Sequence, residues 1–357
     1  MLATRIGASF LSYLGPIGRF QPLRGYFSAY QLLKKKKISG AILKERQSTR
    51  ADIAASINER AGYNQHAPEA WPIFWTLSEN SRLTGQYLLW RDYESKGCLE
   101  ASYGFTKRMN IRSQRFFDNA YLDKPEKLSG AVTSLLTNWT SGNNYYHWII
   151  DALPRLAIRE SLPETTRIII PNSSMRFVQE SISLLGLEDL CIIPTSNHLI
   201  CERFYFISPT AQTGHWNPFA YDWLRRKFST YFSSSSSISR LFFTRKGCKR
   251  IPNNIGEIEA LFERNGFYIV DAGKLTMIEQ IALSSSARCI AGLHGAAMTN
   301  LIWSKKQIPI LEIFESTYLN ACYENIAVYN ECYYHYIFCD ISDAQHHITQ
   351  WISELPP

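Results

Sequence analysis

The sequence has 357 residues, of which 45% are apolar and 19% are charged. This is the composition of a globular protein long enough for two domains, and it excludes an intrinsically disordered chain. The net charge of +7 is concentrated at one end: residues 1–50 contain ten Lys or Arg and one acidic residue, whereas the remainder contains 28 basic and 30 acidic residues. Nucleic-acid-binding proteins carry basic residues along a folded face, so this distribution does not favour a nucleic-acid partner.

The eight cysteines form no C-x-x-C pair. This spacing predicts neither a zinc site nor a disulfide-stapled fold, and we expect a protein of the reducing cytoplasm. The sequence contains no run of eighteen apolar residues, so we predict no transmembrane helix.

Residues 1–85 are predicted to form a basic helical N-terminal extension. Its first part, residues 1–40, mixes aromatic and leucine side chains with the cationic run Lys34–Lys37. One interpretation is a peripheral contact with an anionic membrane at its inner face. The other is an ordinary solvated basic face, which is what most charge runs are. Residues 41–85 are predicted to be helical and then turn-like.

Residues 86–232 are predicted to form a first Rossmann-like domain. Short strand-like segments at 87–90, 101–105 and 132–136 precede a predicted helix at 145–159. Strands then alternate with helices: strand 167–170, helix 174–185, strands 191–193 and 200–207, and helix 221–231. This alternation predicts a parallel sheet covered by helices.

A run of five serines at 233–237 predicts a flexible linker, which we place at residues 233–239. A second Rossmann-like domain is predicted at 240–340, with strands at 241–244, 267–270, 289–293, 308–313 and 333–338 and helices at 255–264 and 276–284. A C-terminal helix is predicted within 341–357. The predicted fold class is therefore α/β, with two doubly wound sheets facing a cleft.

The first of three polar clusters lies at residues 144–155. His147 and Asp151 are four residues apart, so on a helix they share a face. A His–Asp pair beside a cleft can act as a general base with an orienting partner. The alternative is a buried histidine at a capped helix start.

The second cluster follows the predicted strand 241–244. Four cations within six residues, Arg245, Lys246, Lys249 and Arg250, could neutralise a diphosphate. The alternative is a solvated basic loop.

The third cluster is a strand (289–293), a small-residue turn (His294–Ala297), a helix (298–303) and a further strand that carries Glu312. A turn of this kind before a helix presents backbone N–H groups to an anion, most often a phosphate. Glu312 could accept hydrogen bonds from ribose hydroxyls, or it could be a strand-end carboxylate that faces water.

Several signatures are missing from the sequence. It has no Asp-x-Asp, which would indicate a metal ion holding a nucleotide diphosphate. It has no P-loop, no G-x-G-x-x-G and no G-x-S-x-G, so kinases, dehydrogenases and α/β-hydrolases lack support. These motifs therefore indicate no metal and no cofactor.

In this order, the three clusters resemble glycosyltransferase family 61. The resemblance rests on Asn-Tyr-Tyr-His-Trp-x-x-Asp-x-Leu-Pro-Arg, then Thr-Arg-Lys with Arg-Ile-x-Asn, and then Glu279-Gln280 before Gly-x-His-Gly-Ala-Ala-x-Thr-Asn and Leu-Glu-Ile. It covers about 130 to 340. It implies a GT-B fold, an inverting mechanism without a metal, and a nucleotide-sugar donor, commonly a UDP-sugar. In bacteria such enzymes resemble builders of capsular or other surface polysaccharides. The family often has Asn-Glu where this chain has Asn253-Asn254, which leaves the role of position 254 open.

The resemblance and the clusters together give candidate roles. Asp151 is the candidate base, with His147 as its orienter or as the base itself. The candidate donor-binding residues are Arg245, Lys249, Arg250, Asn253, His294, Gly295, Ala296, Ala297, Asn300 and Glu312. The candidate acceptor-binding residues are Tyr145, Tyr146, Trp148 and Arg155, and the acceptor is an oligosaccharide or a glycolipid.

Two other functions fit the same features. A polysaccharide pyruvyltransferase also resembles a GT-B fold with a His-Gly turn. A non-catalytic module that binds carbohydrate or membrane would keep the fold without turnover.

Overall fold

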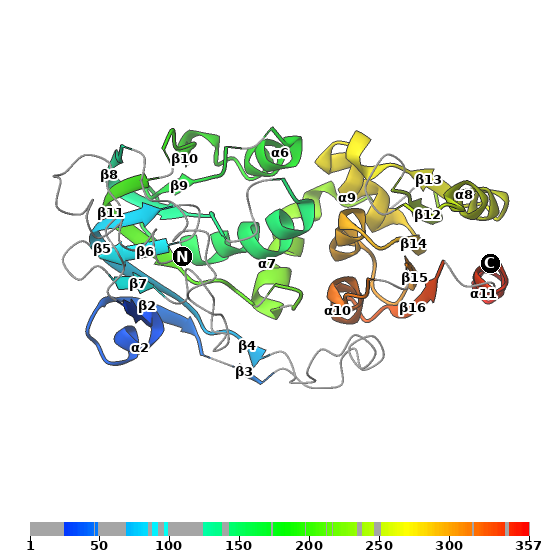
Figure 1. Ribbon diagram of the computed structural model, residues 1–357, viewed down its shortest axis with the longest axis horizontal. Helices are drawn as coiled ribbons and strands as arrows, with labels where there is room; N and C mark the ends of the chain where they lie inside the picture. The colour runs from blue at the N-terminus through cyan, green and yellow to red at the C-terminus, as the bar shows by residue number, and fades with distance from the viewer. Residues whose placement is uncertain are drawn as a thin grey trace, which may run out of the picture. The chain divides into compact units, whose positions relative to one another are not determined.

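A computed structural model of the chain (Figure 1) describes residues 25–45, 47–48, 69–84, 88–91, 96–98, 124–137, 143–172, 174–196, 198–211, 213–215, 217–233, 238–245, 251–315, 318–339 and 343–356. The chain divides into two compact units. The first comprises residues 1–47, 69–175 and 186–212, and the second comprises residues 48–68, 176–185 and 213–357. The serine run 233–237 therefore falls inside the second unit.

Within the described residues, the sheet of the first unit has nine strands: β1 (Gly25–Phe27), β2 (Ser39–Lys44), β5 (Ile73–Thr84), β6 (Leu88–Arg91), β7 (Lys96–Cys98), β8 (Glu126–Ser134), β9 (Arg167–Ile169), β10 (Cys191–Ile192) and β11 (His198–Ile207). Their order is β1-β7-β6-β5-β11-β8-β9-β10, with β2 also paired to β5. β11, β8, β9 and β10 are parallel neighbours, whereas β5 is antiparallel to β2, β6 and β11. A doubly wound parallel sheet was predicted here, and the observed sheet is mixed.

The prediction of a helical segment at 41–85 is wrong for the residues that the structure describes. β2 and β5 occupy much of that segment and pair with one another. β5 also pairs along its length with β11, so its polar half, from Ser78 to Arg82, is held by backbone hydrogen bonds to a long neighbouring strand. Those residues show no apolar alternation, which is why the sequence pattern missed the strand. The further two-residue strands β3 (Gln47–Ser48) and β4 (Glu69–Ala70) lie in the same segment, and the predicted strand 101–105 lies outside the described residues.

The helical part of the extension that the structure describes is α2 (Ala29–Lys34). Ser28 caps it by accepting a hydrogen bond from the N–H of Gln31. Ala29 and Tyr30 are buried in a cluster with Phe74 of β5 and Val132 of β8. The apolar face of α2 thus belongs to the core of the first sheet.

The predicted helix at 145–159 is present, but its geometry changes along its length. A π-helix, η3 (His147–Ala152), is followed by a 3-10 turn, η4 (Leu153–Arg155), and then by α5 (Leu156–Arg159). Pro154 has no N–H to donate to a preceding turn, and the N–H of Leu153 instead reaches the carbonyl of Trp148. π-Helical turns of this kind occur often at functional sites.

The sheet of the second unit has five parallel strands in the described part of the chain: β12 (Arg240–Phe243), β13 (Tyr268–Val270), β14 (Cys289–Leu293), β15 (Pro309–Phe314) and β16 (Tyr333–Phe338). Their order is β13-β12-β14-β15-β16, the 2-1-3-4-5 order of one kind of doubly wound fold. Every residue of β14 is buried, as expected for a parallel strand covered on both faces.

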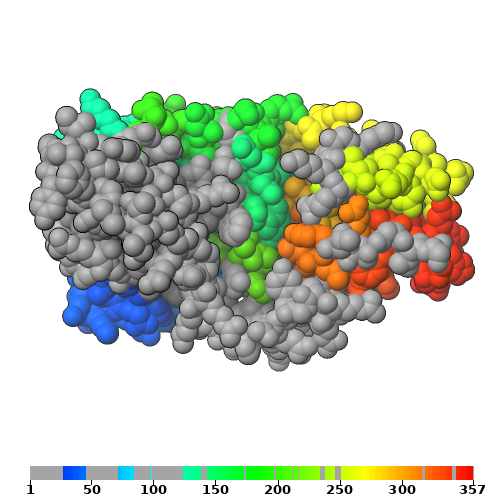
Figure 2. All heavy atoms as spheres, viewed as in Figure 1, coloured from blue at the N-terminus to red at the C-terminus, as the bar shows by residue number. Residues whose placement is uncertain are grey.

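Two helices cover one face of this sheet. α8 (Ile255–Arg264) contributes Ile258 and Phe262, and α11 (Ala344–Ser353) contributes Ile348 and Trp351, to one cluster with the strand residue Leu311. α8 (yellow) and α11 (red) share this cluster, and both lie at the right of the molecule as drawn in ribbons in Figure 1 and in spheres in Figure 2.

The second unit also contains α6 (Arg176–Leu184), α7 (Pro218–Phe228), α9 (Met277–Ser286), the 3-10 helix η8 (Ala296–Trp303) and α10 (Cys322–Tyr329), with the short 3-10 turns η6 (Ser229–Tyr231) and η7 (Ala272–Lys274). A further 3-10 turn, η5 (Glu188–Leu190), belongs to the first unit. The predicted strands and helices from 240 onward are confirmed, with shifts of a few residues at their ends. No helix in the described part of the chain is both long enough and apolar enough to cross a membrane.

Candidate active site

The carboxyl ends of β12 and β14 meet where the strand order of the second sheet reverses. In doubly wound sheets, ligands bind in the crevice at such a switch point. Arg245 follows β12 by two residues, and His294 follows β14 directly. Arg245 of the second polar cluster and His294 of the third therefore converge at this edge.

His294 is held by a carboxylate from the neighbouring strand. Its Nδ1 hydrogen-bonds to Oε1 of Glu312, which is 0% exposed. The other carboxylate oxygen, Oε2, accepts a hydrogen bond of 2.5 Å from the hydroxyl of Tyr334 on β16. Desolvation and the adjacent Glu312 charge raise the pKa of Tyr334 well above its usual range, so the hydroxyl keeps its proton and remains a donor.

Aromatic rings surround the imidazole of His294. Phe314 stacks on it with ring centroids 4.7 Å apart, and the rings of Tyr318 and Tyr323 lie at 5.3 and 5.1 Å. The side chain of His294 is 10% exposed. The ring therefore has little freedom to turn, and only a small part of it reaches solvent.

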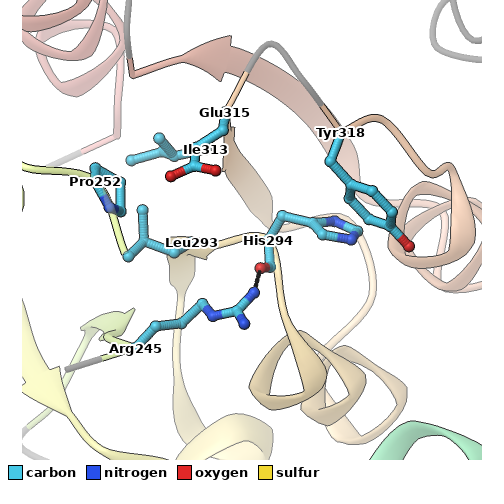
Figure 3. Close-up of a pocket in the computed structure, with 7 residues that line it drawn as sticks. All are labelled: Arg245, Pro252, Leu293, His294, Ile313, Glu315 and Tyr318. Carbon is cyan, nitrogen blue, oxygen red and sulfur yellow. Dashed lines mark hydrogen bonds between the residues drawn. The ribbon is translucent and has the colours of Figure 1, made fainter. Parts of the chain in front are cut away.

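Arg245 lies against the turn that follows His294. Its guanidinium donates a hydrogen bond to the backbone carbonyl of His294 (Figure 3). A Cβ added at Gly295 would lie 2.7 Å from Nη1 and 2.9 Å from Cδ of Arg245. Gly295 has φ 170°, an extended backbone that any residue can adopt. Glycine at position 295 therefore leaves the room in which Arg245 approaches the turn.

η8 begins immediately after Gly295. The N–H of Met298 donates to the carbonyl of Gly295 at 2.8 Å, and the first N–H groups of a helix have no partner within the helix. Ala296 and Ala297 occupy this first turn, as the sequence predicted. Together with Arg245, the turn can receive an anion.

Asn300 lies behind this turn. It is 0% exposed, and its amide nitrogen donates to Oε1 of Gln280 at 2.8 Å and to the carbonyl of Ala297 at 3.0 Å. Gln280 belongs to α9, whose N-terminus is closed by a capping box between Thr276 and Glu279. In the Glu279-Gln280 pair, one residue therefore caps the helix and the other fixes Asn300 to the turn.

The turn and its neighbours line a shallow open hollow (Figure 3). Its lining residues are Arg245, Pro252, Leu293, His294, Ile313, Glu315 and Tyr318. Glu312 is buried with both oxygens engaged, whereas Glu315, directly after β15, lines the hollow. Sequence reasoning selected the first carboxylate and missed the second. The position of Glu315 at the carboxyl end of a parallel strand was the available signal.

The remaining donor-side residues divide into two groups. Asn253 is exposed, and Lys249 and Arg250 lie outside the described residues. Asn254 donates a hydrogen bond of 3.2 Å to the carbonyl of Cys339 after β16. A glutamate, as the related family often has here, could not donate this bond, so in this chain position 254 has a structural contact of its own.

The first unit contains the His–Asp pair. Nδ1 of His147 lies 2.7 Å from Oδ2 of Asp151 on η3, and the two side chains are 20% and 13% exposed. The backbone N–H of His147 is 3.4 Å from Oδ1 of Asn144, and the ring of Tyr146 meets the His147 imidazole edge-on. The predicted interaction of His147 with Asp151 is present, and part of each side chain remains accessible.

The candidate acceptor-binding residues are less accessible. Trp148 is fully buried, and Tyr145 and Tyr146 are nearly so. Arg155 is 4% exposed and donates to the carbonyls of Leu136 and Ile207 at 3.3 and 2.6 Å. Burial lowers its pKa to about 10. Trp148 and Arg155 therefore serve the core in this structure, and the partly exposed His147 and Asp151 are better placed to meet a ligand.

A parallel 2-1-3-4-5 sheet, with a turn at its switch point that can receive an anion, is a doubly wound, Rossmann-like fold. Residues 145–311 of the chain match the family model described as Glycosyltransferase 61. The match runs from the His147–Asp151 helix to β15, and it confirms the resemblance seen in the sequence: this part of the chain is similar to glycosyltransferase family 61, which supports a glycosyltransferase activity. Comparison with curated proteins finds no match.

Proposed function

We propose that this glycosyltransferase transfers a sugar from a UDP-sugar to a saccharide acceptor, with inversion at the anomeric carbon. In this reaction an acceptor hydroxyl attacks the anomeric carbon and gives its proton to a base. The bond from that carbon to the diphosphate oxygen breaks, and the nucleoside diphosphate leaves with the bonding electrons. Negative charge develops on the diphosphate, so catalysis depends on donors aimed at it.

The observation that carries the donor side of the proposal is the placement of Arg245 against the Gly295 turn at the switch point. Arg245, the N–H groups of the turn and His294 would receive the diphosphate without a metal. Lys249 and Arg250, from the same loop, would add positive charge. Glu315 is the carboxylate proposed for the ribose hydroxyls, because it lines the hollow and Glu312 is engaged elsewhere.

On the acceptor side, we assign Asp151 and His147 to the base. The pair is hydrogen-bonded, partly exposed and carried by a π-helical turn. A GT-B arrangement, with the donor held by the second unit and the acceptor by the first, is part of the proposal. The proposed setting is the synthesis of a surface or capsular polysaccharide, at the cytoplasmic face of a membrane that residues 1–40 would contact.

Binding and product analysis test this function. Calorimetry with UDP should give saturable binding, and a panel of UDP-sugars should raise the melting temperature, because a ligand that binds only the folded state stabilises it. Incubation of the stabilising donor with oligosaccharide acceptors should yield a product heavier by one sugar residue. A folded protein that binds no nucleotide would contradict the proposal, and a product heavier by a pyruvyl ketal would indicate a pyruvyltransferase.

A further inference from the structure

A hydrogen-bonded row of three side chains crosses the second sheet below the anion-receiving turn. It runs from His294 after β14, through Glu312 on β15, to Tyr334 on β16. Glu312 is the middle member, 0% exposed, with one oxygen bonded to the imidazole and the other 2.5 Å from the tyrosine hydroxyl. A buried carboxylate without partners is costly, and these two donors satisfy both of its oxygens.

The row determines which nitrogen of His294 carries a proton. An ionised carboxylate only accepts hydrogen bonds, so Nδ1 must be the protonated nitrogen of the neutral ring. Within the described part of the chain, Nε2 makes no hydrogen bond. Nε2 is then an acceptor in the neutral ring and a donor in the imidazolium, whose charge would lie directly beside the Glu312 carboxylate.

Neighbouring side chains restrict rotation of the His294 imidazole. Phe314 stacks on one face at a centroid distance of 4.7 Å, and Tyr318 and Tyr323 lie 5.3 and 5.1 Å away. A rotation of the ring by half a turn would place a carbon atom against Glu312 and leave the carboxylate with one unsatisfied oxygen. Packing and hydrogen bonding thus favour the same orientation.

We infer that Glu312, supported by Tyr334, is a positioning residue that fixes the Nδ1–H of His294 and presents Nε2 to the ligand as a proton-carrying donor when the ring is charged. This inference rests on the proposed nucleotide-diphosphate function for the identity of the ligand. It replaces the expected ribose role of Glu312. Arg245, Glu315, Tyr318 and Tyr323 are further titratable groups near the ring, and among the described residues Nδ1 hydrogen-bonds to Glu312 and to none of these four.

Nitrogen-15 NMR of the ligand-free protein, labelled at histidine, tests the positioning without any ligand. His294→Asn identifies the His294 signals by their loss. At a pH where the ring is neutral, the wild-type spectrum should show a protonated Nδ1 and an unprotonated Nε2 for His294. The opposite tautomer would overturn the inference, whether or not the protein binds UDP.

Calorimetry with UDP tests the consequence. Glu312→Gln keeps the shape of the side chain and removes its charge, and it should weaken UDP binding about tenfold because the charged ring loses its partner. Tyr334→Phe, a second variant with less risk to folding, should keep the Nδ1–H tautomer and weaken binding only a few-fold. UDP affinity unchanged in both variants would also overturn the inference, whereas a wild-type protein that binds no UDP would contradict the proposed function and leave the NMR result standing.

Matched controls lie close by. Glu331→Gln removes a carboxylate charge from an exposed residue whose partner is Lys306 at 2.7 Å. Tyr333→Phe removes a hydroxyl from the residue beside Tyr334, which is 61% exposed. Both controls should leave the His294 signals and the UDP affinity unchanged, and a loss equal to that of Glu312→Gln would mean that the effect is not specific to the row.

Discussion

Arg245 occupies the space that a side chain at Gly295 would need: a Cβ on residue 295 would lie 2.7 Å from Nη1 of Arg245. The small residue in this turn is thus explained by a neighbouring cation. Because the guanidinium is the flexible end of a long side chain, a larger residue at 295 would displace it at little cost to folding.

Gly295→Ala should therefore separate binding from stability. We expect UDP affinity to fall about tenfold, the equivalent of about 1.4 kcal/mol, because Arg245 loses its position beside the anion. The free energy of unfolding should change by less than about 0.5 kcal/mol. Calorimetry and chemical denaturation measure the two quantities on the same preparation.

Gly292→Ala is the matched comparison. A Cβ at that position would lie 2.8 Å from Sδ of Met298 and 3.0 Å from the backbone oxygen of Phe243, in the interior between β14 and β12. The backbone cannot move aside, so we expect this variant to lose about 1–3 kcal/mol of stability. Equal destabilisation by both substitutions would mean that Gly295 is required for packing and not for Arg245.

Asp151→Asn should lower turnover without weakening the binding of the donor. In the wild type, the Asp151 carboxylate lies 2.7 Å from Nδ1 of His147. The amide of the variant has the same size, but it cannot take up a proton or stabilise a charged His147. We expect kcat to fall about a hundredfold or more, with UDP affinity within twofold of wild type. Full activity of this variant would remove the proposed base.

Asp189→Asn provides the control for that experiment. Asp189 is an exposed residue of the same unit, in η5. Its substitution removes one negative charge without touching η3, so turnover should not change.

Ionisation of Tyr334 should lower the stability of the second unit at alkaline pH. Desolvation and the Glu312 charge raise the pKa of Tyr334 in the folded protein, while in the unfolded chain a tyrosine titrates near pH 10. The unfolded state therefore loses this proton first, and the stabilisation is complete below about pH 10 and declines as pH rises through the folded pKa, at about 1.4 kcal/mol per pH unit.

Tyr334→Phe should remove this dependence. Melting temperatures compared at pH 8 and pH 11 should fall less in the variant than in wild type, although the variant is the less stable protein at pH 8. Tyr333→Phe, on the exposed neighbour, should follow wild type. A parallel decline in all three proteins would show that Tyr334 titrates normally.

The strands of the second sheet could be predicted from the sequence for a physical reason. Its strands are buried on both faces and appear as short unbroken apolar runs, such as 289–293, separated by amphipathic helices. The antiparallel part of the first sheet gave no such signal. β5 carries Ser78, Asn80 and Arg82 in its second half, and its pairing with β11 joins residues that are more than a hundred positions apart.

The residues of the site could be predicted from the sequence, but several of their roles could not. The turn at His294–Ala297 and the His147–Asp151 pair were predicted from spacing, because local spacing fixes which residues share a turn or a helix face. Glu312, Asn300 and Arg155 were assigned to ligands and lie buried on protein partners. The pleat of β15 decides whether Glu312 or Glu315 faces the hollow. A strand that is buried on both faces shows no alternation in its sequence, so the facing residue cannot be predicted from the pattern.

Asn300 and Gln280 allow a test of whether a buried amide acts on the turn or on the ligand. Asn300 donates to Gln280 at 2.8 Å and to the carbonyl of Ala297 at 3.0 Å, so it ties the turn to α9. Asn300→Leu and Gln280→Met should each weaken UDP binding several-fold by loosening the turn. Because both break the same link, the double variant should lose little more than either single one.

A double-mutant cycle measures the interaction energy between Asn300 and Gln280. Residues in one hydrogen-bond network show interaction energies of about 0.5–3 kcal/mol, whereas independent sites add to within about 0.5 kcal/mol. If Asn300 contacts the donor directly, its loss should add to that of Gln280, and the coupling energy should vanish. Calorimetric UDP affinities of the wild type, both single variants and the double variant decide between the two, because a buried amide that touches no ligand can affect binding only through the turn that it holds.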